Sequence, residues 1–430
     1  MHRPRSERPA GGLASATGWL AILLALAGPR VAAAESRVFV APTWLAAHLE
    51  DPGVVVVDAR APEDYAKGHV PGAISLSPAL IVDAPQPAAT LGRRGLAADA
   101  TIVCTADSAS IAAAAHLYWL LDRAGASAVR LLDGGIPGWT RAGGALETRP
   151  IFRAPTSWGA PADSTAVADL DFVRWEYGRS GVEIFDARGP EVWGARRPGA
   201  GPARPKRAGH IPHSLPLDFG TLFAPDGSIL DLAAVRELVR RSGPRPGTPV
   251  DMEARFVVYD DGASAIGTLG YALLKHAGID SVRYFPGGWA EWSADSTLPI
   301  VRIVDAAGVR GRMRLWRVRS PESEHPPDFL LLDVRDRFDF GNGHLRGALD
   351  FPSHVFADSL EDWLEECCAG IDRARTPVVL YCYGVECIRS RLCATVAARK
   401  GFRILEWFRG GVDEWKYLGG ELVGGSARSN

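Results

Sequence analysis

The sequence predicts an α/β protein built from three tandem domains, and three observations carry this prediction. A strand-like apolar run that ends in Asp-x-Arg occurs at residues 54–60, 182–188 and 330–335. A strand, a double glycine and a tryptophan close each unit, at residues 132–139, 285–292 and 408–415. Between these landmarks, runs short enough for strands alternate with helical stretches. Such alternation favours parallel strands joined by right-handed crossovers.

The repeats are long enough to be whole domains. From the Asp of the first motif to the first closing glycine, the units measure 76, 101 and 77 residues. A period of this size indicates tandem domains and not a solenoid. The middle unit therefore carries an insertion, which we place chiefly around residues 196–206 and 243–253. A Gly-His turn follows each Asp-x-Arg strand, at residues 68–72, 209–213 and 343–347.

Length and composition agree with this organisation. The chain has 430 residues, of which 47% are hydrophobic and 23% charged, as in ordinary globular proteins. A net charge of −2 gives no footprint for nucleic acid. We expect domains over residues 36–150, 166–300 and 310–425. Residues 148–165, rich in Pro, Ser and Ala, are predicted to be a linker. A second, less distinct linker is predicted from Pro299 to about Val309.

The first 34 residues are typical of a signal peptide. Arg3, Arg5 and Arg8 precede the apolar run 19–27, and three alanines at 32–34 supply a cleavage pattern. The apolar run is too short to span a bilayer comfortably, although an uncleaved anchor is the alternative. We therefore expect a periplasmic or secreted protein with no stable membrane insertion after cleavage.

The third unit contains the stretch most typical of a reactive site. Residues 378–381 predict a buried strand that stops at Cys382, and a helix is expected from about Arg389. Ligands of parallel α/β sheets bind at the carboxyl ends of strands. Loop amides and a helix N-terminus there would lower the pKa of a thiol and bind an anion. The alternative is a buried cysteine that packs as a small hydrophobic side chain.

These motifs, in this order and spacing, resemble the rhodanese domain three times over. The resemblance implies a parallel five-stranded sheet flanked by helices in each unit. It also implies sulfurtransferase chemistry at the loop cysteine, without a cofactor or metal. The third loop resembles a subgroup with a Cys-Asn-Gly-Pro-x-Cys-Trp sequence, from which Tyr383, Val385 and Ile388 depart.

In this chemistry the thiolate attacks the outer sulfur of thiosulfate, releases sulfite and becomes a persulfide. Cyanide or a thiol then removes the sulfur, so small-molecule donors and acceptors are expected, and a protein acceptor is a further candidate. Arg389 would bind the oxyanion, or it is a surface arginine of the helix. Glu386 sets a negative charge in the loop, which keeps a neutral or thiol-bound donor open. The expected substrate and persulfide loop consists of Tyr383, Gly384, Val385, Glu386, Cys387 and Arg389.

The other two units lack the loop cysteine. Overlaying residues 256–262 on 378–384 puts Asp260 where Cys382 stands, and Asp cannot accept sulfane sulfur. In the first unit the same overlay puts Thr105 at the site, with Cys104 one residue earlier. Strand alternation points Cys104 away from the loop, so we predict a buried, inert thiol. A one-residue slip would make it a second nucleophile. The first two units are then structural, or they form walls of the third unit's cleft.

Several alternatives remain open. Cys387 is either a resolving thiol that protects or discharges the persulfide, or a thiol that packs inward. Four cysteines (Cys367, Cys368, Cys382 and Cys387) match no compact zinc motif. A phosphatase of the related cysteine-loop type would need arginine where this chain has Ile388. A non-catalytic sulfur carrier or partner-binding scaffold is the main alternative function.

Four further sets of residues are interpreted structurally. The Asp-x-Arg pairs are predicted to pin a turn, and His69, His210 and His344 to occupy it. Trp407 and Trp415 are expected to pack around the closing turn. A basic cluster is predicted to be a solvated insertion, although it could steer anions; it comprises Arg196, Arg197, Arg204, Lys206 and Arg207.

Overall fold

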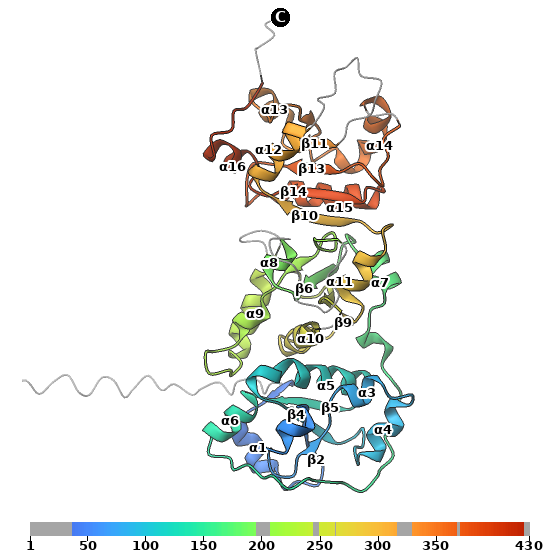
Figure 1. Ribbon diagram of the computed structural model, residues 1–430, viewed down its shortest axis with the longest axis vertical. Coiled ribbons are helices and arrows are strands. Elements are labelled where there is room, and N and C mark those ends of the chain that lie inside the picture. Colours follow the sequence, from blue (N-terminus) through green and yellow to red (C-terminus); the bar gives the residue numbers. More distant parts are fainter. Residues whose placement is uncertain are drawn as a thin grey trace, which may run out of the picture. The chain divides into compact units, whose positions relative to one another are not determined.

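Three parallel sheets flanked by helices form the fold (Figure 1). The computed structural model describes residues 37–194, 207–243, 249–262, 264–315, 329–367 and 370–424. The predicted α/β class and the three tandem units are confirmed. The expected signal peptide, most of the predicted insertion in the middle unit, and Arg196, Arg197, Arg204 and Lys206 lie outside the described residues.

The first unit has a five-stranded sheet in the order β1-β5-β4-β2-β3. Its central strands are rich in buried β-branched residues, which suits strands covered by helices on both faces. The strands are β1 (Phe39–Val40), β2 (Val54–Asp58), β3 (Ile74–Ser75), β4 (Thr101–Thr105) and β5 (Ala128–Leu132). The helices are α1 (Pro42–His48), α2 (Pro62–Tyr65), α3 (Ala79–Val82), α4 (Pro87–Arg93), α5 (Ile111–Arg123) and α6 (Gly135–Arg141).

The second unit has four strands, one fewer than the resemblance implied, in the order β7-β6-β8-β9. At the β9 edge, Val167 forms only an isolated parallel bridge with Tyr284, so no fifth strand extends there. The strands are β6 (Val182–Asp186), β7 (Leu215–Pro216), β8 (Arg255–Tyr259) and β9 (Val282–Phe285). The helices are α7 (Leu170–Glu176), α8 (Pro190–Trp193), α9 (Leu232–Arg241), α10 (Ile266–His276) and α11 (Gly288–Ala294).

The third unit again has five strands, in the order β10-β14-β13-β11-β12. The strands are β10 (Ile300–Val304), β11 (Leu330–Asp333), β12 (Leu349–Asp350), β13 (Val378–Tyr381) and β14 (Ile404–Phe408). The helices are α12 (Ala306–Leu315), α13 (Arg337–Asn342), α14 (Phe356–Cys367), α15 (Arg389–Arg399) and α16 (Gly411–Tyr417). The linker predicted from Pro299 to about Val309 is wrong, because β10 pairs with β14 along its whole length.

Neighbouring units share buried cores. One apolar cluster includes Trp119 and Leu121 of α5 together with Tyr271 and Leu274 of α10. Here the Tyr271 hydroxyl donates to Asp122 Oδ2 at 2.6 Å. A second cluster joins the second and third units, where Trp193 meets the edge of Trp407 at a ring separation of 6.1 Å. By contrast, residues 148–163 contain neither strand nor helix, in agreement with the predicted first linker.

The described helices include none with both the length and the apolar content needed to cross a bilayer.

Candidate active site

Strand register identifies the equivalent position at the carboxyl end of each central strand. Asp58 pairs with Thr105, Asp186 with Tyr259, and Asp333 with Tyr381. The residue after each of these strands is therefore Ala106, Asp260 or Cys382. The sequence overlay for Asp260 is confirmed, but the assignment of Thr105 in the first unit is wrong by one residue. Ala106 stands at the site, and Cys104 lies two residues before it.

The closing glycine pairs hold these three positions in the same way. The second glycine of each pair has a positive φ: 58° at Gly135, 50° at Gly288 and 54° at Gly411. A Cβ on these glycines would lie 2.3, 2.5 and 2.3 Å from the carbonyl oxygens of Ala106, Asp260 and Cys382. Only glycine therefore fits beside each loop. The following amide then donates to the same carbonyl, at 2.9, 2.7 and 3.1 Å.

In the third unit, Cys382 and Cys387 are joined as a disulfide, with a Cα–Cα distance of 6.4 Å. Cys382 is 1% exposed at the end of β13, and Cys387 is partly buried against the same apolar cluster. The Cys387 amide donates to the Gly384 carbonyl at 3.0 Å, which closes the loop into a turn. The loop thus brings the sulfur of Cys387 to the sulfur of Cys382, the candidate nucleophile.

Two side chains of this loop form hydrogen bonds with carboxylates at the start of α13. Arg389, the first residue of α15, donates to Asp336 at 3.2 Å and lies 5.9 Å from the ring of Tyr383. The Tyr383 hydroxyl donates to Asp339. Burial and this hydrogen bond raise the pKa of Tyr383 to about 12. Asp336 and Asp339 were not anticipated, because only the folded loop brings them to the cysteine.

The outer part of the loop faces solvent. Val385 is 57% exposed and Glu386 is also exposed, whereas Gly384 is buried against Asp413. Val385 borders a cavity of about 450 Å³, whose wall also includes Arg409 and Glu414. A small molecule in this cavity would approach the loop from the side that carries Val385.

In the second unit the carboxylate of Asp260 occupies its own loop. It is fully buried and accepts hydrogen bonds from the Gly262 amide at 2.7 Å and the Gly267 amide at 2.9 Å. The Tyr284 hydroxyl donates to it at 3.1 Å. Burial nevertheless raises the pKa of Asp260 above the ordinary value, because the effect of desolvation outweighs that of the hydrogen bonds from the two amides. These contacts show that amides of the loop and the helix start converge on this position.

The first unit offers no reactive group in its loop. Ala106 carries only a methyl group, and the Thr105 hydroxyl is buried without a hydrogen-bond partner among the described residues. Cys104 is fully buried in the core, and burial raises its pKa, as predicted for an inert thiol. Cys393 on α15 is similarly enclosed, and burial raises its pKa to about 12.

The loops also differ in length. Helix α15 begins seven residues after Cys382, α10 begins six residues after Asp260, and α5 begins five residues after Ala106. The third loop is the longest of the three and is the one that contains a second cysteine.

The structural interpretation of the Asp-x-Arg and Gly-His motifs is confirmed. In each unit the arginine binds its Asp and donates through Nη2 to the carbonyl of the turn glycine: Gly68 at 2.7 Å, Gly209 at 2.8 Å and Gly343 at 2.6 Å. The turn histidines each place Nδ1 within 2.9 to 3.0 Å of a backbone carbonyl oxygen, and they stack on Tyr65, Trp193 and Phe340.

Two further interpretations separate here. Trp407 and Trp415 are buried as expected, and Trp407 donates to the Ser390 hydroxyl at 2.9 Å. The prediction that Arg207 belongs to a solvated insertion is wrong. Its guanidinium binds the carbonyls of Ser293 and Leu298 at 3.0 and 2.9 Å, because these carbonyls lie at and beyond the end of α11.

The junction of the second and third units contains a buried arginine and a partly buried histidine that no sequence motif predicted. Arg391 of α15 is 4% exposed, and burial lowers its pKa to about 10. Its Nε has no partner among the described residues, and neither has Nδ1 of His213. Burial also lowers the pKa of His213 to about 4. Glu183 is the carboxylate that acts on Arg391.

Within the described part of the chain, no group of three or more His, Cys, Asp or Glu residues is arranged to hold a metal ion. Cys368 and the side chain of Cys367 lie outside that part.

A family model for the rhodanese-like domain matches residues 41–142, 173–295 and 320–418. One segment falls within each of the three units, and together they cover more than half of the chain.

Curated relatives are sulfurtransferases. A thiosulfate sulfurtransferase of Corynebacterium glutamicum is 30% identical over 283 residues, which are 61% of this chain and 89% of that protein. A 3-mercaptopyruvate sulfurtransferase of Escherichia coli is 25% identical over 287 residues, or 61% of this chain and 97% of that protein. Each match leaves part of the three units uncovered.

Among solved structures, an anaerobic ergothioneine biosynthesis enzyme from Chlorobium limicola, in complex with trimethyl histidine, has a TM-score of 0.53. It is 20% identical, and the match covers 61% of this chain and 70% of that one. At this identity the likeness concerns the fold.

Proposed function

This chain belongs to the rhodanese-like domain family, and we propose that its third unit transfers sulfane sulfur through Cys382. Relatives that transfer sulfur from thiosulfate or 3-mercaptopyruvate support a sulfurtransferase. One observation carries the assignment to this unit. Of the three equivalent loop positions, Ala106, Asp260 and Cys382, the last is the one that can form a persulfide.

The first half-reaction starts from reduced Cys382. Its thiolate attacks the outer sulfur of thiosulfate or a related donor and forms a new S–S bond. The S–S bond of the donor breaks, and sulfite leaves with the electron pair. In the second half-reaction cyanide or a thiol attacks the outer sulfur of the persulfide. Cyanide would leave as thiocyanate, and the cysteine thiolate is regenerated. A protein thiol is a further candidate acceptor.

Activation of the thiolate is assigned to the backbone, because residues 382–389 include no histidine that could serve as a base. The contacts of Asp260 support this assignment, since its carboxylate accepts hydrogen bonds from an amide of the loop and from the amide of the second residue of α10. The corresponding amides in the third unit belong to Gly384 and Ser390. At the N-terminus of an 11-residue helix they would favour a thiolate and then the persulfide anion.

Cys387 is proposed to act as the resolving thiol. Its thiolate would attack the inner sulfur of the Cys382 persulfide, form the observed disulfide and release hydrosulfide with the electron pair. Two electrons from a dithiol reductant would then restore both thiols. In an oxidising compartment, which an exported protein would meet, the disulfide would also protect Cys382 from irreversible oxidation.

Arg389 is proposed to bind the sulfonate oxygens of an anionic donor while Asp336 orients it. The exposed Glu386 opposes anionic donors and favours neutral ones. Export to the periplasm or outside the cell remains a proposal that follows from residues 1–34. N-terminal sequencing of material from a producing cell would test it, with a mature chain expected to begin near Glu35.

The decisive experiment uses the reduced, full-length protein. After treatment with thiosulfate, the tryptic peptide that contains Cys382 should gain one sulfur atom, as measured by mass spectrometry. Turnover with thiosulfate and cyanide should follow at a measurable rate. A loaded peptide without any turnover would favour the second candidate, a non-catalytic sulfur carrier. No sulfur on any peptide would exclude both.

A further inference from the structure

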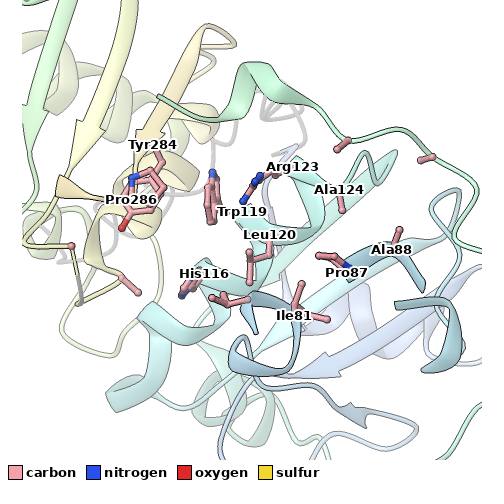
Figure 2. Close-up of a pocket in the computed structure, with 15 residues that line it drawn as sticks. Ile81, Pro87, Ala88, His116, Trp119, Leu120, Arg123, Ala124, Tyr284 and Pro286 are labelled. Carbon is pink, nitrogen blue, oxygen red and sulfur yellow. The ribbon is translucent and has the colours of Figure 1, made fainter. Parts of the chain in front are cut away.

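A cavity of about 570 Å³ lies between the first and second units, well within the range of small-molecule sites. Figure 2 shows Trp119, Leu120 and Arg123 of α5 on one side and Tyr284 and Pro286 of the second unit on the other. Ile81 of α3 contributes to the wall of the first unit. The site is separate from the third loop, and the sulfur chemistry proposed above does not use it.

The second loop borders this cavity. Its anion cradle, by which we mean the amides that converge on position 260, is already occupied by the carboxylate of Asp260. Gly262 and Ala265 line the cavity, yet the loop amides of Gly262 and Gly267 are both bound to Asp260. The Tyr284 hydroxyl also donates to Asp260 and therefore presents mainly its ring. A ligand of this cavity has to find its polar partner elsewhere.

Two aromatic rings line the cavity, one from each unit. The rings of Trp119 and Tyr284 meet edge to face, with centroids 5.1 Å apart and planes at 84°. Trp119 is held in place because its Nε1 donates to the Ala166 carbonyl at 3.1 Å. An aromatic ligand gains from such fixed rings through burial and through stacked or edge-on contacts.

Arg123 is the charged group that faces the cavity. Its guanidinium lies 5.5 Å from the Trp119 ring, and it forms no ion pair with any described residue. The nearby carboxylates are engaged elsewhere: Asp122 binds the Tyr271 hydroxyl and Asp163 binds Thr165. The charge of Arg123 is therefore available to an anion.

His116 is the second titratable group that faces the cavity. Burial lowers its pKa, which leaves the ring neutral near pH 7, where it can supply one further hydrogen bond.

We propose that this cavity binds a small aromatic anion, with its ring against Trp119 and Tyr284 and its carboxylate or sulfonate on Arg123. The degenerate loop of the second unit then serves as one wall of a binding site. Because Asp260 fills the anion cradle, the site would hold its ligand without acting on it.

The test is a calorimetric titration of the full chain with 2-naphthoate and with neutral 2-naphthamide. We expect naphthoate to bind one-to-one, and more tightly than naphthamide. Arg123→Gln should weaken naphthoate about tenfold or more, as expected for a hydrogen bond to a charged group, and leave naphthamide nearly unchanged. Arg94→Gln is the matched control, because Arg94 is exposed on the same unit and lines a different cavity.

Two further variants separate this site from the others. Ala88→Phe, at an exposed position of α4 that lines the cavity, should abolish binding of both probes. Cys382→Ser should leave binding unchanged, because the third loop takes no part. Equal affinity for both probes, or an Arg123→Gln variant that binds naphthoate normally, would overturn the proposal. Failure of naphthoate to bind at its solubility limit would overturn it as well.

Discussion

The loops of the second and third units place two different acidic groups at one backbone position. Asp260 and Cys382 both follow the central strand, and a glycine with positive φ packs against the carbonyl of each. The carboxylate of Asp260 takes up the amides of its loop, whereas Cys382 is bonded to Cys387. The second loop is thus self-occupied, and the third becomes available once its disulfide is reduced.

This comparison separates the scaffold from the chemistry. The Asp-Arg pair, the Gly-His turn and the closing glycines are formed in all three units, so they serve the fold. A sulfur-transferring site additionally needs a nucleophile at the end of the central strand, and the third loop is also one or two residues longer than the other two. In the described chain these two features occur together in the third unit.

The largest effect is expected from removing the nucleophile. Cys382→Ser should abolish sulfur loading, with turnover reduced about a thousandfold or more, because a serine hydroxyl stays protonated near neutral pH and forms no persulfide. Cys387→Ser is the matched control and should still load sulfur after thiosulfate treatment. Peptide mass spectrometry distinguishes the two. If the Cys382 variant loads and the Cys387 variant does not, the assignment of the two cysteines is reversed.

Reduction should have the next largest effect. Wild-type protein isolated with the Cys382–Cys387 disulfide should load almost no sulfur until a dithiol reductant is added, because a disulfide sulfur provides no thiolate. Cys387→Ser should load without reductant and should hold its persulfide longer, since the resolving thiol is gone. Loading would be followed by mass spectrometry over time. Equal loading of oxidised and reduced wild-type protein would contradict this arrangement.

A smaller effect is expected at Arg389. Arg389→Gln should lower kcat/KM for thiosulfate about tenfold, through loss of one charge-assisted contact to the sulfonate. With a neutral persulfide donor the rate should hardly change. Asp336→Asn serves as the companion variant, because it releases Arg389 without removing its charge. An equal loss with both donors would indicate a role for Arg389 in holding the loop.

Much of the fold could be predicted from short local signals. The three Asp-x-Arg strands and the three Gly-Gly-Trp endings predicted the units, because each motif forms contacts within a few residues or across one turn. The strand at Ile300–Val304 was missed because it begins after a proline-containing stretch and pairs with a strand about a hundred residues later.

The candidate site was predictable where a tyrosine marked the register. Tyr259 and Tyr381 directly precede Asp260 and Cys382, and this shared tyrosine aligns residues 256–262 with residues 378–384. In the first unit Thr105 takes the place of the tyrosine, so the overlay slipped and Ala106 was overlooked. The anchors Asp336 and Asp339, and the cavity beside Trp119, depend on segments that only folding brings together. No local sequence pattern predicts these anchors or this cavity.

The smallest effect distinguishes Asp260 as a structural group. Asp260→Ala should leave turnover essentially unchanged, because we assign the chemistry to Cys382 of the third loop. The free energy of unfolding of this variant should fall by about 2 kcal/mol, since two amides and the Tyr284 hydroxyl lose a buried acceptor. Urea unfolding of the purified variant, beside its turnover, measures both. A large loss of turnover in the folded variant would mean that the second loop contributes to the site.

The pH dependence of that stability loss sharpens the assignment. The pKa of Asp260 is raised in the folded protein, so its contribution is fully present below the unfolded pKa of about 3.9. That contribution declines as the pH rises through the folded pKa, because the native carboxyl holds its proton longer than the unfolded one. The deficit of Asp260→Ala should therefore be larger near pH 4 than near pH 7. Asp295→Ala is the opposite control, because hydrogen bonds from Thr297 lower the pKa of Asp295. Its deficit should grow as the pH rises. A deficit of Asp260→Ala that also grows with pH would mean that the hydrogen bonds from the loop amides outweigh burial, and that the second loop favours the charged carboxylate.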